Sequence, residues 1–143
     1  MTNASTGDGK PVATADSGIE RTPSIEMAIS NEMVRLYKSL LGRGPTKART
    51  GWIGADTVVV MLEETLTPAE RNLVRLGEHQ RLRDVRTFFQ YATVDEFCQP
   101  IEQLTGRKVR GFVSGIDTAV EGLAVELFAL HPDGYDGPSR SDQ

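Results

Sequence analysis

Apolar side chains recur at steps of three and four residues over positions 23–41, which is the period of a helix with one buried face. Thr22 can cap this helix, Pro23 suits its first position, and Gly42 suits the left-handed residue just past its end. We therefore predict an amphipathic helix here. Its apolar positions are Ile25, Ile29, Met33, Leu36 and Leu40.

The pattern then changes to short extended segments. Residues 50–53 and 57–62 lie on either side of Gly54, Ala55 and Asp56, which are residue types that tight turns favour. The second segment, TVVVML, is rich in β-branched residues and typical of a sheet interior. Together the two segments predict a β-hairpin.

A second helical region begins at Thr67 and ends at Gly106. Thr67, Pro68 and Glu70 supply a capping hydroxyl, a proline at the first helical position and a glutamate at the third, which together form a capping box. One side of this region is apolar up to position 92. The residues on that side are Leu73, Val74, Leu82, Val85, Phe88, Phe89 and Ala92.

Past position 92 the apolar side chains move to the opposite side of the helix, at about 100° per residue. Either the helix stops near Ala92 and a second one begins at a capping box over 93–96, or one long helix across 66–106 buries opposite faces in different places. Because the shifted face needs a partner, we interpret it as the interface of a homodimer. The interface residues are Val94, Phe97, Ile101 and Leu104.

Segments 108–114 and 122–130 predict two final strands. In the last strand, apolar residues alternate with Glu126 and Phe128, which fits a sheet with one face on helices. The order of elements is therefore α-β-β-α-(α)-β-β. We predict an α+β fold, a two-layer sandwich in which a four-stranded, mainly antiparallel sheet carries helices on one face. The alternating apolar residues are Leu123, Val125, Leu127 and Ala129.

The 143 residues are enough for one domain, at 24–131, that buries a core without disulfides or metals. Residues 1–23 contain almost no large apolar side chain, so we predict a disordered N-terminal tail, and we predict a flexible C-terminal tail at 132–143. The single Cys98 excludes an internal disulfide, and no apolar run is long enough for a membrane span or a signal peptide. We therefore expect a cytoplasmic protein.

The charge of the predicted domain argues against one class of partner. Positions 24–131 hold 14 acidic residues and 13 Lys or Arg, a net charge of −1. A domain dedicated to nucleic-acid binding is normally clearly basic. Nucleic acid is therefore not the partner that the composition favours.

The loop over 42–49 joins two glycines to Arg43, Lys47 and Arg49, and at first resembles a phosphate cradle. A P-loop, however, runs from a strand into a helix and requires GxxxxGK(S/T), so that the positive helix N-terminus meets the phosphate. Here the loop leaves a helix C-terminus, whose partial negative charge repels anions. We interpret it first as a helix stop, and second as a basic edge that contacts an anionic ligand or an acidic partner.

Five basic side chains of the second helical region share one face, at spacings of four, four, four and three. The face lies opposite the apolar side. It is either a solvated face, with arginine chosen for its helix propensity, or a docking surface for acidic protein, phosphate or anionic lipid. The residues of this arginine stripe are Arg71, Arg75, His79, Arg83 and Arg86.

No catalytic or cofactor-binding set is recognisable in the sequence. His79, His131 and Cys98 cannot assemble a zinc site without carboxylates at improbable spacing. Cys98 lies on the apolar side of its segment and fits a small core residue. We therefore predict a protein that is not an enzyme, with no catalytic residue, no cofactor and no metal.

Six segments together resemble one bacterial family. They are 30–38, 42–48 (GRGPTKA), 61–63, 66–71 (LTPAER), 104–109 (LTGRKV) and 125–130 (VELFAL). The set is similar to the MpsC-like domain family, which is labelled as part of a sodium-translocating, membrane-potential-generating system. The resemblance covers about residues 25–131 and supplies no catalytic residues to carry over.

The resemblance implies a small soluble protein, of a kind sometimes encoded beside inorganic-carbon or ion-uptake membrane proteins. Because the sequence has no membrane span, we expect this chain to assist such a system rather than to move ions itself. Our first hypothesis is a non-enzymatic accessory or regulatory protein that acts through protein–protein contacts as a homodimer. The alternative is an anion or nucleic-acid binding module that uses the arginine stripe and the basic loop.

Overall fold

The computed structural model describes residues 23–143, so the predicted N-terminal tail, apart from Pro23, lies outside the described residues. Within these described residues the larger elements are four helices and four strands, and a short 3₁₀ helix, η2, follows at Arg140–Asp142. The helices are α1 (Ile25–Leu41), α2 (Pro68–Arg75), α3 (His79–Ala92) and α4 (Val94–Thr105). The strands are β2 (Lys47–Ile53), β3 (Thr57–Glu63), β4 (Val109–Asp117) and β5 (Leu123–Leu130).

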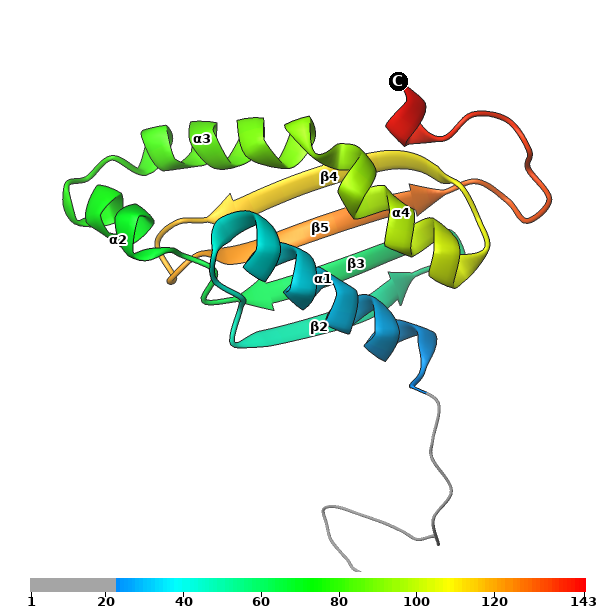
Figure 1. Cartoon of the computed structure of the whole chain (residues 1–143), viewed down its shortest axis with the longest axis horizontal. Coiled ribbons are helices and arrows are strands. Elements are labelled where there is room, and N and C mark those ends of the chain that lie inside the picture. The colour runs from blue at the N-terminus through cyan, green and yellow to red at the C-terminus, as the bar shows by residue number, and fades with distance from the viewer. Residues whose placement is uncertain (1–22) are drawn as a thin grey trace, which may run out of the picture.

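The four strands form one sheet in the order β2-β3-β5-β4, and every neighbouring pair is antiparallel. The helices α1, α3 and α4 lie against the same face of this sheet, with α1 over β2 and β3 and with α3 and α4 over β4 (Figure 1). The predicted α+β fold is confirmed. Two strands extend beyond their predicted ranges. Strand β2 begins at Lys47 instead of position 50, and β4 continues to Asp117 instead of ending at position 114.

Helix α1 buries most of its predicted apolar side, but it begins later, and its first residue, Ile25, is exposed. Ser24 caps it, since the Ser24 side chain accepts a hydrogen bond from the Met27 N–H at 3.1 Å. At the other end Gly42 adopts the left-handed conformation, and its N–H donates to the carbonyl of Lys38. The buried residues of this helix are Ile29, Met33, Leu36 and Tyr37.

The second helical region is divided into three helices. The capping box at Thr67 and Glu70 forms as predicted and starts α2. Gly77 takes a positive φ of 76° and separates α2 from α3, a break that helical periodicity alone does not reveal. The break near Ala92 is present, but Thr93 does not cap α4, because its hydroxyl donates to the carbonyl of Phe89 at 2.9 Å.

The core lies between the sheet and the helices α1 and α4. Its centre contains four aromatic rings in contact, from Tyr37, Phe97, Phe112 and Phe128. On β5 the buried side is the one that carries Glu126 and Phe128, so the alternating apolar residues of that strand lie on the other face of the sheet.

The segment 132–143, predicted to be a flexible tail, contacts the rest of the domain. The hydroxyl of the buried Ser139 donates to the Glu102 carboxylate on α4, and Lys108 donates to the carbonyl of Gly137 at 2.8 Å. The ring of Tyr135 stacks on His131 with centroids 3.6 Å apart. In the structure this segment therefore packs on α4 and β4.

Candidate functional site

Two of the three buried side chains of helix α3 are polar. Its buried residues are Leu82, Arg86 and Gln90, spaced by four, and only the first is apolar. The side chain of Arg86 is only 2% exposed, so a charged group lies inside the domain. A buried arginine is tolerated where its charge is paired and its N–H groups have acceptors.

Arg86 has both. Its Nε donates to Glu70 Oε2 at 2.7 Å and its Nη2 to Glu70 Oε1 at 3.0 Å, a two-point contact with the carboxylate. Nη2 also donates to the carbonyl of Thr65 at 2.7 Å. Because Glu70 belongs to the capping box of α2, this pair ties the start of α2 to the middle of α3. The guanidinium carbon lies 5.9 Å from the centre of the Tyr37 ring.

A second buried chain of polar groups links α3 to the sheet. Gln90 Nε2 donates to the Tyr37 hydroxyl at 3.3 Å, and that hydroxyl donates to Glu126 Oε2. Burial raises the pKa of Glu126 from 4.5 to about 7, while the hydrogen bond from Tyr37 and the charge of Arg86 oppose the rise. Burial, and next the charge of Glu126, also raise the pKa of Tyr37.

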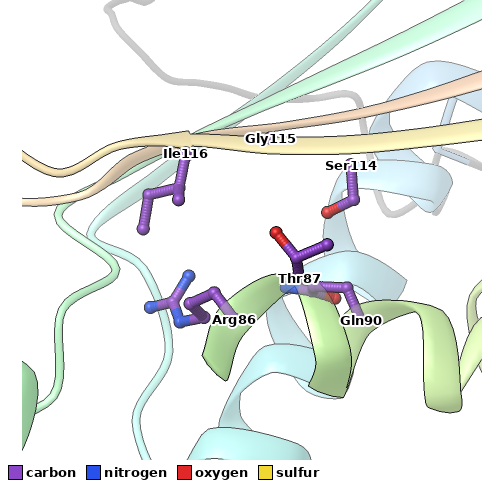
Figure 2. A pocket seen from close by; sticks show the side chains of 6 residues that line it. All are labelled: Arg86, Thr87, Gln90, Ser114, Gly115 and Ile116. Atoms are coloured by element: carbon purple, nitrogen blue, oxygen red, sulfur yellow. The ribbon is translucent and has the colours of Figure 1, made fainter. Parts of the chain in front are cut away.

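A small cavity lies between α3 and β4 at this cluster. In Figure 2, Arg86, Thr87 and Gln90 on α3 face Ser114, Gly115 and Ile116 on β4. The space leaves about 10 Å³ for the centre of a water molecule, close to what one buried water requires. Among residues 23–143, Arg86 Nη1, Gln90 Oε1 and Glu126 Oε1 have no hydrogen-bond partner. Arg86 and Gln90 line the cavity, so a water there can accept from Arg86 Nη1 and donate to Gln90 Oε1.

The opposite side of α3 is apolar and exposed. Val85 is 57% exposed and Phe88 is 74% exposed, and Ala92 lies one turn further along the same side. The prediction that this side packs into the core is therefore wrong for these three residues, which we call the α3 stripe. The physical reason is that Arg86 finds buried partners in Glu70 of α2 and in Thr65, and Gln90 finds one in Tyr37 of α1, which turns the polar side inward.

The sheet also has an apolar face on which none of the helices within residues 23–143 lies. The helices that contact the sheet lie on one side, and strand alternation places another set of side chains on the other side (Figure 1). Ile53 is 65% exposed there and Val113 is 57% exposed. The other apolar residues of this open face are Val59, Met61, Leu123, Val125, Leu127 and Ala129.

The predicted dimer interface is wrong. Phe97 and Ile101 are fully buried in the core of the same chain, and Val94 and Leu104 pack against that core. Helix α4 crosses α1 and β4, so its apolar side is covered within the chain. The change of apolar face after position 92 thus reflects two helices with different orientations, not a surface awaiting a second molecule.

The arginine stripe does not form one continuous face, because the break at Gly77 changes the direction of the chain. Arg71 pairs with Glu121 at 3.1 Å and Arg75 contacts Asn72. His79 Nδ1 lies 2.6 Å from the Thr118 hydroxyl, and Arg83 donates to Gln80 at 3.1 Å. Arg86 is buried, so it is not available on the surface.

The basic loop also separates into two parts. Arg43 donates to the backbone carbonyls of Glu64 and Leu66, at 2.8 and 2.6 Å, and so fastens the loop to the start of α2. Lys47 and Arg49 are exposed on β2, on the open face of the sheet. The interpretation as a helix stop agrees with the geometry at Gly42. A binding role for Lys47 and Arg49 stays a prediction.

Two further findings concern metals and membranes. Among residues 23–143, no group of three or more His, Cys, Asp or Glu is placed to hold a metal ion. Cys98 is buried, and burial together with the charge of Glu102 raises the pKa of its thiol to about 12. None of the helices in this part of the chain has the length and hydropathy needed to cross a bilayer.

Sequence reasoning missed the two buried carboxylate contacts of this cluster. A signal for one of them is present, because Glu126 is the only charged residue in the otherwise apolar strand LAVELFAL. No signal in the sequence distinguishes Arg86 from the exposed arginines, since its partners Glu70 and Thr65 come from other elements.

Comparison with known proteins adds one finding. No curated protein and no solved structure matches the chain. The family described as "Na+-translocating membrane potential-generating system (MpsC)" matches residues 22–131, which include all four larger helices and all four strands. The chain therefore belongs to the MpsC family.

Proposed function

We propose that this chain is a non-enzymatic accessory protein that acts by contact with another protein of a membrane system for ion or inorganic-carbon uptake. The family description supports the link to a system that generates a membrane potential. One structural observation carries the contact role, namely the α3 stripe of Val85, Phe88 and Ala92. These apolar residues face solvent, whereas the polar Arg86 and Gln90 of the same helix are buried.

The energetic argument rests mainly on Phe88. An aromatic side chain buries about 150–250 Å² when it is covered, and the ring is 74% exposed. At about 25 cal/mol per Å², covering the exposed part contributes about 3 to 5 kcal/mol. Aromatic residues that are exposed in the isolated protein and become central in an interface are typical binding hot spots. The partner fits the stripe best if it offers an apolar groove or helix.

The alternative function, an anion or nucleic-acid binding module, has less support. It requires several free cations on one face. Arg71, Arg75 and Arg83 each contact a neighbouring side chain, and Arg86 is buried.

The experiment is affinity purification from membranes of the source organism, followed by mass spectrometry. The full chain serves as bait, beside Phe88→Ser and a matched control, Val120→Ser, which changes an exposed apolar residue in the loop between β4 and β5. We expect an ion-transporting membrane protein with the wild type and the control, and at least a tenfold loss with Phe88→Ser. Equal recovery with Phe88→Ser, or no such membrane protein with the wild type, would contradict the proposal.

A further inference from the structure

The two edge strands of the open sheet face carry complementary side chains. On this face β2 presents Lys47, Arg49, Gly51 and Ile53, while β4 presents Asp117, Gly115, Val113 and Gly111. No heavy atom lies within 4 Å of the position that a Cβ would take at Gly51 or Gly115. Each of these glycines therefore leaves a dent at an edge of the face, beside the apolar central residues Val59 and Val125.

The register of the sheet arranges these residues in rows that cross all four strands. In each of three rows, one edge carries a large side chain and the opposite edge carries glycine, and both central residues are uncharged. The rows are Ile53, Thr57, Ala129 and Gly111; Gly51, Val59, Leu127 and Val113; and Arg49, Met61, Val125 and Gly115. At the end of the sheet, Lys47 pairs with Glu63 of β3 and Asp117 pairs with Leu123 of β5, so Lys47 and Asp117 lie at the same end of the two edges.

We propose that a second copy of this chain covers the open face, related by a two-fold axis that runs along the strands between β3 and β5. A rotation about this axis exchanges β2 with β4 and keeps every row at its own level. Ile53 of one copy then faces Gly111 of the other, and Val113 faces Gly51. In the same way the central residues Val59 and Leu127 meet at the middle of the interface.

The charges at the end of the sheet fit the same rotation, because Lys47 of each copy comes to face Asp117 of the other. A two-fold contact uses one surface patch twice, so it requires a patch that complements itself. On the open face, both the shape and the charge of the patch complement themselves under this rotation. Two sheets packed face to face lie about 10 Å apart with strands within about 30° of each other, which permits side chains to fill the dents at glycine.

This interface is separate from the α3 stripe, which lies on the helical side of the sheet (Figure 1). The dimer therefore does not depend on the function proposed above, and one surface can be tested while the other stays intact. A dimer of this form presents two α3 stripes on its two outer layers.

The first test measures the oligomeric state of the full chain by sedimentation velocity. We expect the wild type to be a dimer at tens of micromolar, roughly the range of a modest dissociation constant. Ile53→Lys places a charge against Gly111 twice in each dimer and should raise the dissociation constant about 100-fold. The matched control Leu76→Lys puts the same charge on an exposed apolar residue between α2 and α3, away from the open face, and should leave the dimer unchanged.

The second test examines the register itself. Lys47→Asp and Asp117→Lys each place like charges opposite each other and should weaken the dimer about tenfold. The double variant K47D/D117K should restore it, which a merely destabilised fold would not do.

Three outcomes would overturn the proposal. They are a wild type that stays monomeric at about 100 µM, a dimer that survives Ile53→Lys but is lost in Phe88→Ser, and a double variant that is weaker than either single one. In the second case the copies pair through α3. Failure of the membrane pull-down with an intact dimer would instead contradict only the accessory role.

Discussion

Replacing Glu126 by glutamine should remove a pH-dependent loss of stability that the wild-type chain carries. Glutamine has nearly the same shape and keeps an oxygen that accepts the hydrogen bond from the Tyr37 hydroxyl. The substitution therefore removes the titration while it retains the packing of the buried cluster. No other group in the contact changes.

The size of the effect follows from the pKa of Glu126, which burial raises from 4.5 to about 7. Below pH 4.5 the carboxyl is protonated in both folded and unfolded chains, so burial costs no ionisation energy. Between pH 4.5 and about pH 7 the folded chain binds more protons than the unfolded chain, so the free energy of unfolding falls by about 1.4 kcal/mol per pH unit as the pH rises. The total loss is about 3 kcal/mol and is complete above pH 7.

The assay is urea unfolding of wild type and Glu126→Gln at a fixed protein concentration, from pH 4.5 to pH 8.5. At each pH we take the free energy of unfolding of the variant and subtract that of the wild type. This difference should be about 3 kcal/mol larger at pH 8 than at pH 4.5. Glu96→Gln, which replaces an exposed carboxylate on α4, serves as the control for the loss of one charge. A difference for Glu126→Gln that does not change with pH would refute the reasoning.

Two further predictions concern stability and use the same unfolding assay. Arg86→Ala leaves the Glu70 carboxylate without its buried partner and should cost about 3 to 5 kcal/mol; a cost below 1 kcal/mol would show that the pair contributes little. Gly122→Ala introduces a Cβ 2.8 Å from the Leu66 side chain at a positive φ of 78° and should cost about 2 to 3 kcal/mol. Gly77→Ala, with a similar φ and open space around it, should cost only about 1 kcal/mol, and equal losses at the two glycines would contradict the assigned clash.

The sequence predicted the elements well where local chemistry decides them. Thr67, Pro68 and Glu70 form the capping box at the expected place, because all of its contacts lie within four residues. The β-branched run of β3 lies inside the sheet, and the hairpin register places Ile53 opposite Thr57 around the expected turn. The order of elements then left few ways to pack them, so the α+β fold was predictable.

The candidate site was not predictable to the same extent. Periodicity counts apolar residues on each side of a helix, and for α3 it favours burial of Val85 and Phe88. The structure buries Arg86 instead, because Glu70 and Thr65 supply acceptors that are far away in sequence. For α4 the same reasoning assigned Phe97 and Ile101 to a second molecule, whereas the sheet of the same chain covers them.

What the sequence determined by itself is the order of the helical and extended segments and the local signals that begin and end most of them, because backbone propensity, capping and alternation act over a few residues. Only the tertiary structure decided which side of α3 faces inward, that Arg86 and Glu126 are buried, and which face of the sheet stays open. Those outcomes depend on partners that folding brings together from distant positions. The cost of burying a charge is set by its neighbours in space, and neighbours in sequence do not reveal them.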